Sequence, residues 1–65
     1  MSATQNSLDN LTQSVIILQN ERWVIEFEVG GMAADLIDDV IMAANTRIGQ
    51  LQQQLTVERN ASERG

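Results

Sequence analysis

Five carboxylates around a double glycine are the closest approach to a reactive cluster in this chain. They are Glu26, Glu28, Asp35, Asp38 and Asp39, with Gly30 and Gly31 between the two groups. The three aspartates share one helix face because their spacing is i, i+3 and i+4. Sites for Ca²⁺ or Mg²⁺ also need loop carbonyls at a defined spacing, and the chain has no such motif. We therefore expect no metal, and a charged tip that is either simply solvated or a contact for a basic partner.

Residue types that perform catalysis at neutral pH are missing. The chain contains no His, Cys, Tyr or Lys. A Ser or Thr nucleophile would have no His or Lys base beside it. The double glycine is followed by Met-Ala-Ala, so it is not a phosphate-binding loop. We expect a protein that is not an enzyme and that holds no cofactor.

The charge balance narrows the classes of partner. The net charge is −5 at pH 7, which argues against direct nucleic acid binding and against adsorption to anionic membranes. It favours a neutral or basic protein partner. The longest apolar run, 15–18, is far shorter than the roughly 20 residues that span a bilayer. Because no basic residue lies near the N-terminus, as a secretory n-region would require, we expect a cytoplasmic protein of the producing or host cell.

Two segments free of proline flank the double glycine. This pattern predicts an all-α fold, an antiparallel hairpin with helices over 7–29 and 32–58 and a turn at 30–31. Asn6 or Ser7 is the expected cap of the first helix. The polar segments 1–6 and 59–65 are expected to be disordered.

Apolar residues follow a heptad pattern in both segments. The seam that we expect to hold the hairpin and its oligomer together consists of Leu11, Val15, Leu18, Ile25, Ile37, Ile41, Ala44, Ile48, Leu51 and Leu55. Arg22 fills one seam position, where it would pair with an acid of a partner helix and set the register, or extend to solvent.

Further apolar residues lie outside the seam, more than one helix partner can cover. A chain of 65 residues without Cys or His also lacks disulfides and zinc to compensate for a small core. We therefore expect a homodimer that forms a four-helix bundle with coiled-coil character.

A different fold competes for the end of the first segment. The run 23–29 alternates at period two and is rich in β-formers. A dimer with a short β-ribbon and one long helix is therefore the alternative. Two observations favour the helix. Residues 19–22 contain none of the dipeptides that tight hairpins require, and a seven-residue strand would cover only about 23 Å of the roughly 40 Å second helix.

Trp23 and Phe27 are the aromatic residues and lie one helical turn apart. Both are either core residues or anchors for a partner, since Trp is enriched at binding hot spots. We favour Trp23 as mostly core, with the acidic residues as a weaker, steering contact.

These features predict a small protein-binding regulator or inhibitor that acts as an oligomer on a larger partner. Small size, acidity and a Met at position 1 suggest a stand-alone gene product of the kind that phages and plasmids encode. The alternative is a structural or assembly subunit of a larger particle. An acidic nucleic-acid mimic ranks below both, because the acidic residues are few and clustered.

Overall fold

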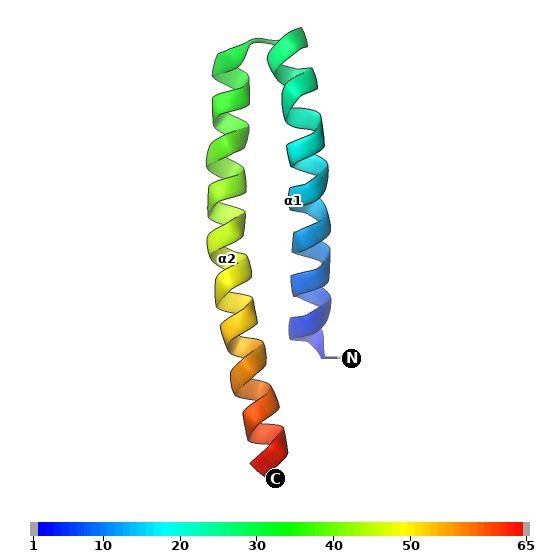
Figure 1. The fold of residues 1–65 in the computed structure, drawn as a ribbon, viewed down its shortest axis with the longest axis vertical. Helices are drawn as coiled ribbons and strands as arrows, with labels where there is room; N and C mark the ends of the chain where they lie inside the picture. The colour runs from blue at the N-terminus through cyan, green and yellow to red at the C-terminus, as the bar shows by residue number, and fades with distance from the viewer. Residues whose placement is uncertain (1, 65) are drawn as a thin grey trace.

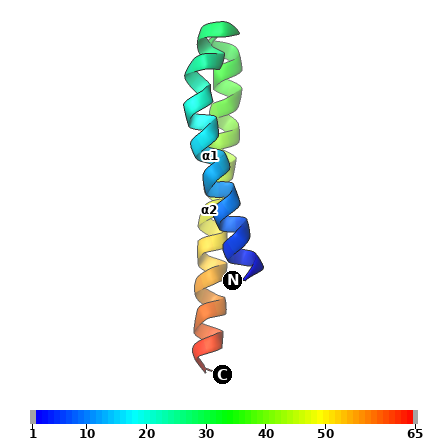
Figure 2. The ribbon, with the colours of Figure 1, turned by 90° about the vertical axis from the view of Figure 1, so that its right-hand side faces the viewer.

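The computed structural model of the chain describes residues 2–64, which form two antiparallel helices. Helix α1 spans Ala3–Glu28 and helix α2 spans Gly31–Arg64. The two helices lie side by side in both views, and α2 runs past the start of α1 (Figure 1, Figure 2). The molecule measures 53 × 17 × 11 Å. The predicted all-α hairpin is therefore confirmed for a single chain.

Both helices are longer than predicted. Helix α1 begins at Ala3 because Ser2, in an extended conformation, accepts a hydrogen bond from the Gln5 N–H at 3.1 Å, so Ser2 is the cap in place of Asn6 or Ser7. Helix α2 continues to Arg64, and no Gly or Pro lies between Gly49 and Gly65 to interrupt it. Residues 3–6 and 59–64, expected to be disordered, are thus helical. Met1 and Gly65 lie outside the described residues.

The β-ribbon alternative is wrong within residues 2–64. Residues 23–28, which alternate at period two, are the last turns of α1. Local strand propensity does not determine the structure here. The helical spacing of Leu18, Arg22 and Ile25 lets this segment pack along α2 over its whole length, and the packing of one face provides most of a helix's stability.

The core is a single seam between α1 and α2. Val15, Ala34 and Leu51 are buried in it. The other predicted seam residues are partly buried: Leu11, Leu18, Ile25, Ile37, Ile41, Ala44, Ile48 and Leu55. The heptads therefore pack the two helices of one chain against each other, and a second copy would have to use side chains outside this seam.

The turn depends on one glycine in a conformation that other residues avoid. Gly30 has φ +129°. The N–H groups of Val29 and Gly30 both donate to the carbonyl of Ile25, at 2.8 and 3.1 Å, and the Ala34 N–H donates to the Gly30 carbonyl at 3.3 Å. The backbone N–H of Gly30 thus bonds to a carbonyl at the end of α1, and its carbonyl bonds to an N–H at the start of α2, while the chain reverses direction.

The two adjacent glycines should respond in opposite directions to alanine. Nothing lies within 4 Å of a Cβ at either position, so no clash occurs. Gly30→Ala should lower the free energy of unfolding by about 1–3 kcal/mol, because alanine is strained at positive φ. Gly31→Ala should leave it unchanged or raise it by up to about 1 kcal/mol, since Gly31 is helical. Urea unfolding measures both, and equal effects would contradict this account of the turn.

Candidate protein-interaction surface

One ion pair joins the two helices near the turn. Arg22 Nε donates to Asp38 Oδ1 at 2.6 Å, and its Nη2 donates to Asp38 Oδ2 at 3.0 Å. Arg22 Nη1 also donates to Glu26 Oε2 at 3.0 Å within α1. A two-pronged bond of this kind fixes the orientation of both side chains. Arg22 therefore pairs as expected for a polar seam residue, and its partner acid lies on α2 of the same chain.

This pair alters the acidity of the carboxylate. The hydrogen bond from Arg22 lowers the pKa of Asp38, desolvation opposes the shift, and the charge of Arg22 adds to it. The bond stabilises the ionised form of Asp38 specifically. Asp38 is thus part of the scaffold that sets the register, in addition to its place in the acidic group.

The five acidic residues divide by what they contact. Asp38 and Glu26 are bonded to Arg22. The other three, Glu28, Asp35 and Asp39, are exposed. Within residues 2–64, no group of three or more acidic side chains is arranged to hold a metal ion. The acidic tip is therefore a charged surface whose free members are Glu28, Asp35 and Asp39.

The placement of the two aromatic residues corrects one prediction. Trp23 is 67% exposed and Phe27 is 83% exposed, so Trp23 is not a core residue of the hairpin. The reason is the heptad phase: Arg22 and Ile25 occupy the seam positions, which turns their neighbours Trp23 and Phe27 outward. Within one chain both residues therefore lie outside the seam and are accessible to a second copy or to another protein.

Apolar side chains gather on the side of the seam that carries Arg22, Glu26 and Asp38. Helical spacing places Ile16 and Trp23 of α1 there, and Met42 of α2 lies one turn beyond Asp38. All three are exposed. We refer to Ile16, Trp23 and Met42 as the Trp23 face.

A second apolar surface lies on the opposite side of the seam. Heptad spacing assigns to it Ile17, Val24, Ala33, Leu36, Val40 and Ala43, which we call the Val40 face. Leu36 is 65% exposed and Val40 is 54% exposed. The stripe ends in charge on both sides, with Glu28 beside the turn and Arg47 one heptad beyond Val40. The hairpin thus presents apolar side chains on both of its broad faces.

The free end of the hairpin holds a polar cluster that sequence reasoning missed. Thr4 is buried and donates to Glu58 Oε2 at 2.6 Å. Gln54 Nε2 bonds to Glu58 Oε2 at 3.1 Å and to Thr4 Oγ1 at 3.4 Å. The heptad pattern contains a signal for this cluster. Thr4 lies one heptad before Leu11 and Glu58 one heptad after Leu51, so both occupy seam positions.

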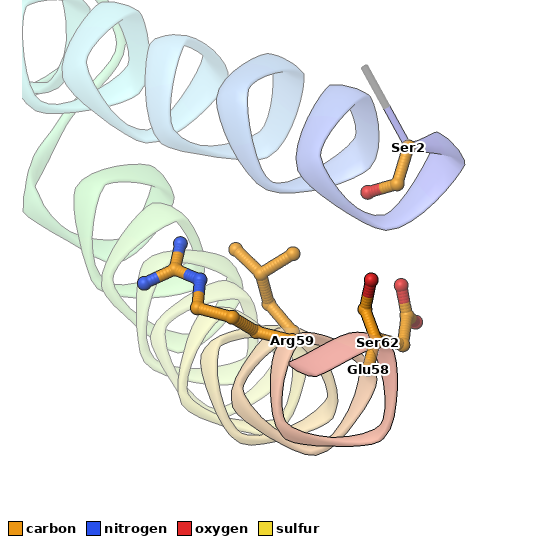
Figure 3. A pocket seen from close by; sticks show the side chains of 5 residues that line it. Ser2, Glu58, Arg59 and Ser62 are labelled. Atoms are coloured by element: carbon orange, nitrogen blue, oxygen red, sulfur yellow. The ribbon is translucent and has the colours of Figure 1, made fainter. Parts of the chain in front are cut away.

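Beside this cluster lies an open hollow of about 450 Å³. It is lined by Ser2, Leu55, Glu58, Arg59 and Ser62. Figure 3 shows Glu58 and Ser62 at the end of α2 directed towards the start of α1, where Ser2 lies. The lining combines the apolar Leu55 with two serine hydroxyls, the Glu58 carboxylate and the Arg59 guanidinium.

Comparisons with known proteins give no relative. No protein family, no curated protein and no solved structure matches this chain. Within residues 2–64, neither helix has an apolar stretch long enough to cross a membrane. The function must therefore be inferred from the surfaces just described.

The Arg22–Asp38 bond predicts a defined pH response. Because the folded pKa of Asp38 is depressed, its contribution to stability is present above the ordinary Asp pKa of about 3.9 and is lost as pH falls towards the folded value. NMR titration of the Asp38 carboxyl should show its pKa rise in Arg22→Gln. The matched control is Arg47→Gln, which removes an arginine that does not contact Asp38. Equal Asp38 titration in the wild type and in Arg22→Gln would refute the contact.

Proposed function

We propose that this chain is a non-enzymatic protein-binding module that acts as an oligomer and regulates or inhibits a larger protein. The exposed pair Trp23 and Phe27 is the observation that carries the proposal. Trp is the residue most enriched among binding hot spots, and large apolar side chains left in water on a small protein commonly mark an interaction site.

The spacing of these residues fits one recognition mode. Ile16, Trp23 and Phe27 follow a single stripe along the outer part of α1, at helical intervals. An amphipathic helix that lays such anchors into a partner's groove is a common way for helices to bind proteins. The Arg22–Asp38 bond supports this mode, because it holds α1 against α2 and so reduces the ordering that binding must impose.

The charge near these anchors favours a basic partner. Asp35, Asp39 and Glu28 are exposed at the same end of the hairpin as Trp23 and Phe27. Complementary charge around an apolar contact speeds association and discriminates against acidic proteins. The proposed partner therefore has an apolar groove with basic residues at its edge.

A structural or assembly subunit is a second candidate, and a specific observation favours it. Apolar side chains are exposed on two opposite faces, the Trp23 face and the Val40 face. A subunit inside a particle contacts neighbours on more than one side, and two opposite apolar faces provide for such contacts. Open-ended association of the purified chain would favour the assembly subunit over the regulator.

The binding test uses matched variants of α1. A partner captured from the native host would be purified and its dissociation constant measured with the hairpin. Trp23→Ala should weaken binding by about 30-fold or more, as expected for a hot spot of 2 kcal/mol. Gln13→Ala, an exposed polar position of the same helix, is the control and should bind like the wild type. Equal affinity for both variants would remove Trp23 from the binding surface.

The contribution of charge should be tested with Asp35→Lys/Asp39→Lys. These two carboxylates are exposed, whereas reversal of Asp38 would also break its bond to Arg22. The double reversal should slow association with a basic partner, and wild-type binding should weaken as salt increases. An association rate that is unchanged by the reversal and by salt would exclude steering by the acidic tip.

A further inference from the structure

The hairpin exposes more surface than its mass requires. A compact monomer of 7.2 kDa is expected to expose about 4,100 Å². The hairpin exposes 4957 Å², an excess of about 800 Å². A specific protein–protein contact of standard size removes about 800 Å² from each partner. One additional contact of ordinary size per chain would therefore bring this molecule to the exposure of a compact protein.

We propose that a second copy of this chain covers the Val40 face, with the turns of the two hairpins at opposite ends of the dimer. This assignment rests on the self-association included in the proposed function and specifies the face and the orientation. It leaves the Trp23 face free for a different protein.

The Val40 face suits a second copy better than the Trp23 face does. On α2 it is continuous, because Ala33, Leu36, Val40 and Ala43 follow each other at heptad spacing with no charge between them. On the Trp23 face, the ion-paired Glu26 and Asp38 lie among the apolar residues, and an interface core is normally depleted of charge. On α1, Glu21 lies between Ile17 and Val24, so α2 supplies the main contact.

Charge selects the orientation of the two copies. Glu28 and Arg47 flank the Val40 face at its two ends, each roughly 10–12 Å from Val40 along the hairpin axis. A two-fold axis that passes by Val40 with the turns at opposite ends brings Glu28 of one copy near Arg47 of the other. Glu21 lies one heptad before Glu28, at the level of Val40, so near the two-fold axis it faces its own copy and must extend to solvent at the edge of the contact. With the turns at the same end, both Glu21 and Glu28 would face their own copies and the two acidic tips would meet. Like charges in register are unfavourable, so the opposite arrangement is preferred.

The arrangement also explains the uneven composition of α2. The stripe that includes Val40 and Ala43 continues as Arg47, Gln50 and Gln54. An apolar contact centred on Val40 would end at Arg47, where the polar residues begin. Beyond that point α2 needs only its seam with α1, and Gln54 takes part in the polar cluster with Thr4 and Glu58 instead.

The first experiment determines the mass and the face. Sedimentation equilibrium of the wild type should give twice the 7.2 kDa chain mass, and Val40→Asp should raise the dimer dissociation constant more than about 100-fold. Met42→Asp introduces the same charge on the Trp23 face of the same helix and should leave the dimer intact. Circular dichroism of each variant shows that its helices remain. A monomeric wild type, or a Met42→Asp variant that dissociates while Val40→Asp does not, would overturn the proposal.

The second experiment determines the orientation. Because the chain has no Cys, a single introduced thiol reports on one contact. Val40→Cys should form a disulfide-linked dimer on mild oxidation, and Met42→Cys should not. Glu28→Arg and Arg47→Glu should each weaken the dimer about tenfold, and the double variant should restore it. Efficient cross-linking through Glu28→Cys would indicate turns at the same end and refute the orientation, whether or not Val40→Cys also cross-links.

The native indole separates this proposal from the proposed function. Trp23 is the single tryptophan, and a dimer through the Val40 face leaves it in water. Its emission and its quenching by iodide should therefore not change as the chain dimerises, and a shift to shorter wavelength on dimerisation would refute the assigned face. A monomer that still binds its protein partner would refute the dimer and the self-association included in the proposed function, while the protein-binding role would remain. If the protein is a dimer and Trp23→Ala does not change its affinity for the partner protein, the proposed role of Trp23 in binding is refuted and the dimer is not.

Discussion

Two helices can form only one interface with each other, and the rest of this structure follows from that constraint. Each helix can bury a single stripe against its neighbour. In this hairpin the stripe contains Val15, Ala34 and Leu51 as its buried residues. Most large apolar side chains outside it are exposed, including Ile16, Ile17, Leu36, Val40 and Met42. The exposure of Trp23 and Phe27 is therefore a consequence of the fold's thinness and is not a local irregularity.

Polar contacts define the register of this contact. Apolar side chains in a heptad seam would fit similarly after a slip of one heptad, so the register depends on the short turn at Val29 and Gly30 and on the polar contacts. The Arg22–Asp38 bond near the turn and the Thr4–Glu58 bond near the free end do not tolerate such a slip. A shifted pairing would leave Arg22 without its carboxylate and Thr4 without its acceptor, and polar seam groups are known to select register in this way. The hairpin is thus fixed at both ends by specific bonds and filled between them by non-specific packing.

The two broad faces differ in a way that suits different neighbours. The Val40 face is apolar and continuous along α2, with one charge of each sign at its ends. The Trp23 face combines an exposed indole with ion-paired and free carboxylates. A symmetric contact benefits from a continuous apolar centre with complementary ends, whereas a contact with a different protein benefits from an aromatic anchor and steering charge. This division fits the proposed combination of self-association with recognition of another protein.

Much of the fold could be derived from the residues alone. The double glycine and the two heptads identified the hairpin, its seam and its turn, because these depend on local geometry and on periodicity. Three features required the tertiary structure. The register of α1 against α2 determines that Arg22 pairs with Asp38 and not with another acidic residue near the turn. The phase of α1 placed Trp23 in solvent. The cap at Ser2 and the bond from Thr4 to Glu58 extended α1 to the free end. Each of these depends on how one helix is rotated and shifted against the other, and the helical period of a single segment does not contain that information.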